Sequence, residues 1–230
     1  MVTASPVDKE AVRLEYDQGN LYIGHKDRYQ MEAEKRPWTT RRVPSVNECL
    51  EIMDKHHMLP NIRRHSVMVA RVAFVVGEAL NRGGSDLNMR LILAGALLHD
   101  IAKTRSLREG GNHVELGEKM VLELGYPEVA SIVAQHVGGG SEIADTIDEA
   151  AVVNYADKRV QHDRLVPLKD RFEDLVARYG KTGERRSRLR KMGGNAQCLE
   201  GAICSRISMT PDELEKIIET AHDVILSECG

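Results

Sequence analysis

The sequence predicts an all-α protein, and three observations support this fold class. No strand-like alternation of apolar and polar residues extends beyond a few positions, and no internal repeat is present. Apolar residues instead recur at helical spacing between capping residues. Hydrophobic residues make up 42% of the chain but aromatic residues only 4%, so aliphatic side chains must fill the core, which favours packed helices.

The most apolar stretch, Leu91–Leu98, marks the centre of the predicted fold. Nothing charged interrupts it before His99-Asp100. A helix that is apolar on every side is buried, and this one is too short to cross a membrane. An imidazole and a carboxylate at its buried end are costly unless a partner satisfies them. A bound cation would do so, since both groups are natural ligands of first-row metals.

The composition limits the class of protein. A chain of 230 residues fits one large domain, or one domain with an appendage, and its net charge of −3 argues against a dedicated nucleic-acid binder. The four cysteines form no C-x-x-C pair and show no disulfide-scaffold spacing. The N-terminus has no apolar leader, and no run of 18 apolar residues occurs. We therefore expect a cytoplasmic protein that does not associate with membranes.

Capping residues and periodicity define the helices in chain order. Ser45 and Glu48 form a predicted capping box, and Pro60 opens the second helix. Asn112 with Glu115 caps a later helix, and Thr146 with Glu149 caps a further one. Residues 104–111 are expected to be a polar loop. We expect helices at about 45–57, at 62–80, from a cap at Ser85 or Asp86 to Asp100, and at 113–124, 127–136, 147–157, 167–179 and 211–227.

Three parts are predicted along the chain. They are an N-terminal extension at 1–43 without assigned chemistry, a main domain at 44–180, and a basic loop with C-terminal helices at 181–230 that pack on that domain. Residues 181–191 contain six basic residues and one acidic residue, and form either a solvated face or a basic lid over an anionic substrate. Gly193-Gly194 is expected to interrupt the structure before a segment that ends near Ile207.

Six side chains of metal-binding type lie on, or at the ends of, the predicted helices. His65 and Asp157 each fall on the apolar face of a helix, where an unsatisfied imidazole or carboxylate would be costly. His56 and His57, by contrast, end a helix at its polar side and are expected to be surface residues. The candidate ligands are His65, His99, Asp100, His113, His136 and Asp157.

The order H…HD…H…H…D resembles the HD-domain superfamily of metal-dependent phosphohydrolases, over about residues 45–165. The resemblance implies an orthogonal helical bundle, here with N- and C-terminal helical extensions. It also implies one metal held by His65, His99, Asp100 and Asp157, and a second held by His113 and His136, with Asp100 bridging. The segments that carry the resemblance are Arg64-His65-Ser66, Leu97-Leu98-His99-Asp100-Ile101-Ala102-Lys103, Asn112-His113, Ala134-Gln135-His136 and Tyr155-Ala156-Asp157-Lys158.

Within this superfamily, the chain most resembles the small stand-alone branch that includes the symmetrical diadenosine tetraphosphate hydrolases. No Gly-Tyr-Pro signature follows His136, which argues against the cyclic-di-GMP phosphodiesterase branch. No nucleotidyltransferase or synthetase domain is expected, so the larger tRNA-repair and alarmone enzymes are poor models.

The expected chemistry is hydrolysis of a phosphate ester or anhydride. Two divalent metal ions, drawn from Fe, Mn, Mg, Ni or Zn, would polarise a phosphoryl oxygen and acidify water. Asp100 and Lys103 are the expected catalytic residues, Lys103 by stabilising developing negative charge as the family's lysine at this position does. Five further residues are candidate substrate-binding cations, namely Arg64, Arg105, Lys158, Arg159 and Arg164.

Two other functions share this pattern. In a minority of the superfamily the same ligand set holds di-iron and serves an oxygenase, and the ligands alone do not separate the two activities. A non-catalytic sensor on the same fold usually lacks one or more ligands, whereas all six are present here. The expected partner is a small phosphorylated substrate such as a nucleotide, without specific nucleic-acid binding. The sequence does not identify the substrate, the native metal or the oligomeric state.

Overall fold

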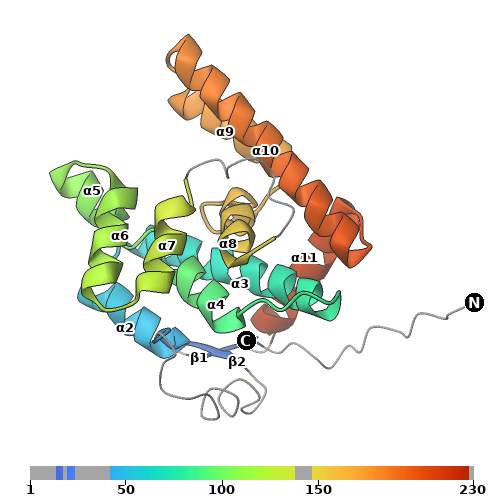
Figure 1. The fold of residues 1–230 in the computed structure, drawn as a ribbon, viewed down its shortest axis with the longest axis horizontal. Coiled ribbons are helices and arrows are strands. Elements are labelled where there is room, and N and C mark those ends of the chain that lie inside the picture. The colour runs from blue at the N-terminus through green and yellow to red at the C-terminus, as the bar shows by residue number, and fades with distance from the viewer. Residues whose placement is uncertain (1–13, 18–19, 24–41, 138–146, 228–230) are drawn as a thin grey trace, which may run out of the picture. The chain divides into compact units, whose positions relative to one another are not determined.

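A computed structural model describes residues 14–17, 20–23, 42–137 and 147–227. The chain divides into two compact units, one of residues 1–40 with 219–230 and the other of residues 41–218. Most of the described residues are helical, and the described strands form two short antiparallel hairpins (Figure 1). The predicted all-α fold class is confirmed.

The helices lie close to their predicted positions. Capping accounts for several boundaries, as the Ser45–Glu48 capping box is present and Asn112 caps the helix that starts at His113. The bounds are α2 Val46–Lys55, α3 Pro60–Arg82, α4 Met89–Leu98, α5 Lys103–Glu109, α6 His113–Glu123, α7 Pro127–Gln135, α8 Glu149–Lys158, α9 Leu168–Tyr179, α10 Gly183–Ile207 and α11 Pro211–Ser227.

The core of the larger unit forms around α3 and α4. Helix α4 packs against α2, α3, α7 and α8, and nearly all of its residues are buried, as its uninterrupted apolar sequence predicts (Figure 1). Gly95 permits the close approach of α7, because a Cβ atom there would lie 2.8 Å from Cγ2 of Ile132. This packing carries the end of α4, with His99 and Asp100, into the interior.

Two helix starts differ from the prediction. The N-cap of α4 is Asn88, whose side chain accepts a hydrogen bond from the Leu91 amide at 3.2 Å, rather than Ser85 or Asp86. The N-cap of α8 is Asp148, whose Oδ1 accepts a hydrogen bond from the Ala151 amide at 2.8 Å, whereas the predicted cap, Thr146, lies outside the described residues. In both cases the residue nearest the apolar run takes the capping position.

Residues 104–111 were expected to be a loop, but most of them belong to α5. Thr104 is buried, and its Oγ1 accepts a hydrogen bond from the Leu59 amide at 2.9 Å. Arg105 and Glu109 form an i,i+4 ion pair at 2.8 Å that supports the helix. The helix ends at Gly110, which has a φ of +84°. The polar composition of this segment therefore did not reveal the short helix, which the buried side chain of Thr104 fixes to the rest of the domain.

The prediction of a basic loop at 181–191 is also wrong, since all of these residues except Lys181 and Thr182 belong to the continuous helix α10. Gly193-Gly194 does not interrupt this helix. Gly193 instead lies against the ring of Phe172 on α9, where an added Cβ would be 3.1 Å from Cγ. The glycine permits close packing of two helices, and this contact outweighs its low helix propensity.

Two short hairpins were not predicted. In the smaller unit, β1 (Leu14–Asp17) pairs with β2 (Asn20–Ile23). In the larger unit, β3 (Val160–Gln161) pairs with β4 (Arg164–Leu165) around a turn of two residues, His162 and Asp163. Strands of two to four residues are too short to show a recognisable alternation.

No helix among the described residues is long and apolar enough to span a bilayer.

Candidate metal centre

His65 lies near the start of α3 and is buried. Its Nδ1 atom is 2.8 Å from the carbonyl oxygen of His162, at the turn between β3 and β4. Because a carbonyl oxygen only accepts hydrogen bonds, Nδ1 carries the proton and Nε2 keeps a lone pair. That Nε2 is 3.1 Å from Oδ1 of Asp157.

His99 and His136 occupy equivalent positions on two helices. They are the C-caps of α4 and α7, and both are buried. Nδ1 of each ring is 2.7 Å from the carbonyl oxygen three residues earlier, that of Ala96 or Val133. Both rings therefore also direct an unprotonated Nε2 into the interior.

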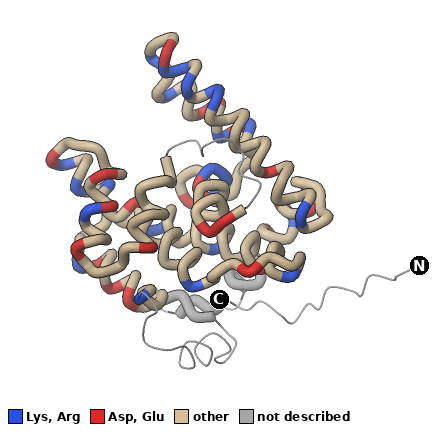
Figure 2. The backbone as a smooth tube through the Cα atoms, in the orientation of Figure 1, with Lys and Arg blue, Asp and Glu red and all other residues tan. Residues whose placement is uncertain are grey.

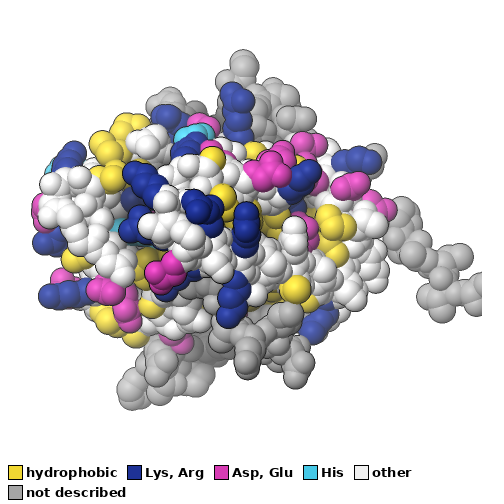
Figure 3. All heavy atoms as spheres, turned by 90° about the horizontal axis from the view of Figure 1, so that it is seen from above, with side chains coloured by type: hydrophobic (Ala, Val, Ile, Leu, Met, Phe, Trp, Pro, Cys, Tyr) yellow, Lys and Arg dark blue, Asp and Glu magenta, His cyan; other side chains and the backbone are white. Residues whose placement is uncertain are grey.

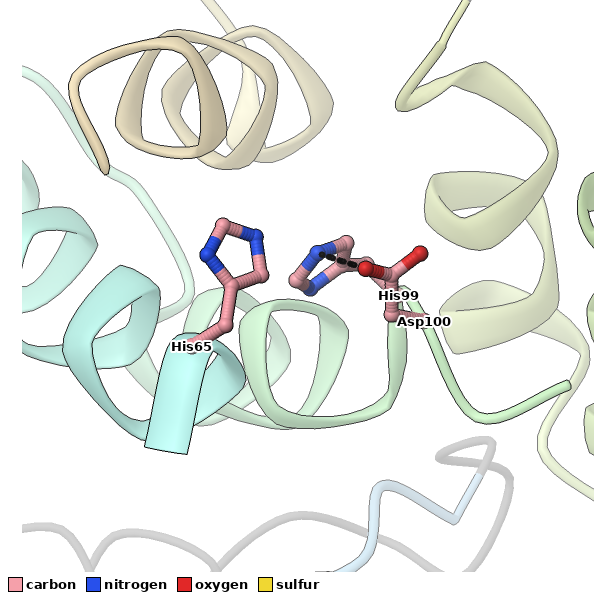
Figure 4. A group of neighbouring side chains, drawn as sticks. All are labelled: His65, His99 and Asp100. Atoms are coloured by element: carbon pink, nitrogen blue, oxygen red, sulfur yellow. Dashed lines mark ion pairs between the residues drawn. The ribbon is translucent and has the colours of Figure 1, made fainter. Parts of the chain in front are cut away.

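Asp100 lies among these imidazoles. Its Oδ2 is 3.4 Å from Nε2 of His99, and its Oδ1 is 3.6 Å from Nε2 of both His113 and His136. Figure 4 shows His65, from α3, pointing toward His99 and Asp100 at the end of α4. The ring centroids form a continuous row, with separations of 5.3 Å from His65 to His99, 5.0 Å from His99 to His136, and 5.4 Å from His136 to His113.

This arrangement brings hydrogen-bond acceptors together. Nε2 of His99, Nε2 of His136 and Oδ1 of Asp100 are buried and have no hydrogen-bond partner. Unprotonated nitrogens and carboxylate oxygens that face one another repel, unless a positive charge lies between them. Imidazole nitrogen with carboxylate oxygen is a donor set that suits first-row divalent metals. The residues present therefore fit metal ions.

The candidate ligands form two overlapping groups. The first contains His65, His99 and Asp100, and the second contains Asp100, His113 and His136. Within each group the ligand atoms lie within 4.8 Å of one another. Asp157 adjoins the first group, with Oδ1 3.7 Å from Nε2 of His99. All six predicted ligands thus converge, and Asp100 belongs to both groups.

Lys103 lies at the solvent side of the cluster. Its Nζ is 2.7 Å from Oδ2 of Asp100, and its side chain is 43% exposed. Burial and the nearby charge of Arg171 oppose its protonation, but the carboxylates of Asp100 and Asp157 outweigh them and raise the pKa of Lys103. The ammonium group is therefore charged and lies between the cluster and solvent.

The two carboxylates are held in the ionised form. Burial alone would raise the pKa of Asp100, but its contacts with His99 and His136 and the ammonium of Lys103 outweigh burial, and this pKa lies well below its usual range. The pKa of Asp157 is likewise well below its usual range, because Lys158 and His65 outweigh burial. Two buried carboxylates are thus available as anionic ligands.

Lys158 is buried behind the cluster and does not face solvent. Its Nζ donates to Oδ2 of Asp157 at 2.6 Å and to the carbonyl oxygen of His136 at 2.9 Å. Asn154 donates to the same carbonyl oxygen at 2.9 Å. Both residues therefore connect α8 to the end of α7, which argues against the substrate contact expected of Lys158.

Arg159 is also placed away from the cluster. Its buried guanidinium is 2.9 Å from Oε1 of Glu200 on α10 and 2.5 Å from Oε2 of Glu215 on α11, and it donates to the hydroxyl of Tyr155 at 2.7 Å. The two carboxylates neutralise the positive charge of the Arg159 guanidinium group. The substrate-binding role expected for Arg159 is therefore not supported, because adjacency to Asp157 in sequence does not place the side chain on the same face.

The other predicted cations are exposed. Arg64 pairs with Asp163 at 3.2 Å, and Arg105 pairs with Glu109 at 2.8 Å. Arg164 is exposed on β4. His56 and His57 are outside both ligand groups. None of these residues belongs to the clustered ligands.

Two contributors to the site were not predicted. The backbone of His162, which has a φ of +59°, orients His65 through its carbonyl oxygen. Arg171 on α9 is close enough to affect the charge of Lys103. Positive φ at a residue other than glycine has only a weak sequence signal, here the His162-Asp163 pair itself.

The chain is similar to several known proteins. An uncharacterized protein of Methanocaldococcus jannaschii is 26% identical over 135 residues, covering 53% of this chain and 79% of that protein. A tRNA (cytidine(56)-2′-O)-methyltransferase of Thermoplasma volcanium is 27% identical over 177 residues, covering 70% of this chain and 48% of that protein. A dihydroneopterin 2′,3′-cyclic phosphate phosphodiesterase of Methanocaldococcus jannaschii is 31% identical over 129 residues, covering 50% of this chain and 52% of that protein.

The chain thus spans about half the length of the last two relatives. No solved structure matches it significantly. The model of the HD domain family matches residues 62–160, and this range contains all six clustered ligands. By ligand order, helical fold and this match, residues 62–160 of the chain form an HD domain.

Proposed function

We propose that this protein is a metal-dependent phosphohydrolase that cleaves an ester or anhydride bond of a nucleotide or other small phosphorylated metabolite. The observation that carries the proposal is the set of buried, unprotonated Nε2 atoms that face carboxylate oxygens without hydrogen-bond partners. The HD domain at residues 62–160 and the similarity to a cyclic phosphate phosphodiesterase support the same class of reaction.

The six clustered residues would hold two divalent ions. His65, His99, Asp100 and Asp157 would hold one, and Asp100 with His113 and His136 would hold the other. Divalent ions at such a site supply Lewis acidity toward a phosphoryl oxygen and lower the pKa of water.

The solvent side of the cluster is where a substrate would enter. His113 has the most exposed side chain of the six, at 27%, and Lys103 lies beside Asp100 at the same opening. A phosphate group bound there would compete with Asp100 for the ammonium of Lys103. In that position the ammonium stabilises the negative charge that develops as the bond to the leaving group breaks.

The decisive test is phosphate release by protein freed of metal with a chelator and then reloaded. Mn²⁺, Mg²⁺, Ni²⁺ and Fe²⁺ would each be tried against mononucleotides, dinucleoside polyphosphates and 2′,3′-cyclic nucleotides. We expect at least one metal to restore hydrolysis in this panel, and the chelated protein to show none.

Oxygen consumption measured in the same Fe²⁺ samples distinguishes the alternative reaction. Oxygen-dependent turnover without phosphate release would replace the hydrolase by a di-iron oxygenase. Absence of both activities with all metals bound would contradict catalysis on these substrates.

A further inference from the structure

Helices α9 and α10 form an antiparallel hairpin that extends away from the helices around the metal centre (Figure 1). Its connection is short and internally bonded. The Gly180 amide donates to the Val176 carbonyl oxygen at 2.9 Å, and Nη1 of Arg186 donates to the Gly180 carbonyl oxygen at 2.8 Å. With Gly193 packed on Phe172, these contacts give the far end of the hairpin, Tyr179–Lys191, a defined structure. We call this end the basic tip.

The basic tip concentrates positive charge. Residues 181–191 carry six basic side chains and one acidic side chain, a formal charge of +5 in a chain whose total is −3. All six basic residues are exposed, and none is ion-paired with a carboxylate of the described residues. Figure 2 shows Lys and Arg along the hairpin, and Figure 3 shows them gathered on the face toward which it extends. The six are Lys181, Arg185, Arg186, Arg188, Arg190 and Lys191.

This charge does not stabilise the fold. Like charges within a few residues repel one another, and cations in the first turn of a helix oppose its macrodipole. Arg185 and Arg186 lie in the first turn of α10. A cluster of like charges that repel one another, and that have no carboxylate partner among the described residues, indicates a polyanionic ligand.

An exposed aromatic ring lies beside these charges. The side chain of Tyr179, at the end of α9, is 56% exposed, and it is the one large hydrophobic residue of the described hairpin with such exposure. A nucleobase stacks on an exposed tyrosine, and arginine guanidinium groups bind phosphates through paired hydrogen bonds. A membrane-binding helix would instead need a continuous exposed apolar face, but the apolar side of α10 packs on α9.

We propose that the basic tip binds single-stranded nucleic acid without sequence preference, with Arg185, Arg188 and Arg190 contacting phosphates and Tyr179 stacking on a base. The proposal is independent of the reaction at the metal centre.

The test is fluorescence anisotropy of labelled oligouridylate and oligothymidylate of about 16 nucleotides, a length within the usual range of single-strand sites. Full-length protein is titrated at several salt concentrations, and gels check that the probe stays intact. We expect Arg185→Gln/Arg188→Gln/Arg190→Gln to weaken binding tenfold or more and to reduce the log–log salt slope by about 2, or ~0.7 per lost phosphate contact. The RNA and DNA probes show which backbone is preferred.

Matched variants make the result specific. Lys55→Gln/Arg82→Gln/Lys119→Gln removes three exposed basic residues elsewhere and should bind within twofold of wild type. Tyr179→Ala should weaken binding about fivefold or more, and Tyr179→Phe should not. Equal losses in the two triple variants would overturn the proposal, as would no binding at low salt. Tighter binding to vesicles containing phosphatidylglycerol than to either oligonucleotide would assign the basic tip to a membrane instead.

Discussion

Asp100 is the residue on which the cluster depends. Its two oxygens approach three imidazoles and one ammonium, at 3.4 to 3.6 Å and 2.7 Å. It is buried and ionised, so it would contribute both a ligand atom and the negative charge that offsets a bound cation. Its loss should affect metal binding more than the loss of any single histidine.

We predict that Asp100→Asn, which keeps the size of the side chain but removes its charge, loses most bound metal and all phosphate release. Elemental analysis after dialysis and a hydrolysis assay check this. His57→Asn is the control, since His57 is exposed at a φ of +51° that asparagine tolerates. If Asp100→Asn kept full metal content, the proposed bridging role would be wrong.

Lys103 should act on the reaction and not on metal binding. Removing one donor to transition-state charge lowers kcat by ~10²–10³, so Lys103→Ala should show that loss at unchanged metal content. Steady-state kinetics beside elemental analysis measure both quantities. Lys103→Arg, which keeps the charge, should recover part of the rate. A rate for Lys103→Ala within a few-fold of wild type would mean that the lysine only pairs with Asp100.

The turn between β3 and β4 is an element that serves the metal centre. His162 adopts a left-handed backbone conformation, and its carbonyl oxygen fixes the tautomer of His65. Partners that orient a metal ligand in this way contribute substantially to metal affinity. The side chain of His162 is not needed for this contact, whereas its backbone conformation is.

We therefore predict opposite results for two substitutions at this position. His162→Gly should keep metal affinity, because glycine adopts positive φ without strain. His162→Val should weaken metal binding by about tenfold, because a β-branched residue disfavours that conformation and the hydrogen bond to His65 is lost. Isothermal titration with Mn²⁺ compares them, and equal affinities would show that the turn does not orient the ligand.

Helix positions were predictable where apolar periodicity and caps agree, as for α2, α3 and α6. The prediction failed where tertiary contacts decide the structure. Helix α5 depends on Thr104, which bonds the distant Leu59 amide, and α10 continues through Gly193 because Phe172 packs on that glycine. Neither partner is near in sequence, so local propensity alone predicted a loop at 104–111 and an interruption of the structure at Gly193-Gly194.

The same distinction applies to the metal centre. The six candidate ligands were predicted from their order in the chain, and the structure brings these six side chains together. The roles of Lys158 and Arg159 could not be identified, because the direction of a side chain at a helix end depends on its neighbours. His162 orients His65 through its backbone carbonyl oxygen, and a backbone contact of this kind can hardly be predicted from the identity of the residue.

Across the whole molecule, Arg159 connects three helices. Its buried guanidinium joins α8 to Glu200 on α10 and to Glu215 on α11. Removing one partner of a buried ion pair leaves an uncompensated charge. The stability of this assembly should therefore depend on Arg159, even though the metal centre does not contact it.

We predict that Arg159→Met lowers the free energy of unfolding by roughly 3 kcal/mol. Urea denaturation followed by circular dichroism measures this, and the kcat of the folded variant should match wild type. Arg164→Met, at an exposed position, is the control and should change stability by less than about 0.5 kcal/mol. A large fall in kcat with unchanged stability would restore a substrate-binding role for Arg159.

The hydrogen bonds of His99 and His136 have a consequence for the order of folding. Each ring is aimed by a carbonyl oxygen of the helix that carries it, only three residues away. Such local contacts form early, before distant segments meet. Once α4 and α7 pack together through Gly95 and Ile132, two correctly directed nitrogen ligands are already present. A cation captured at that stage would act as a template for the folding chain, drawing α3 and α8 into place as His65 and Asp157 complete its coordination.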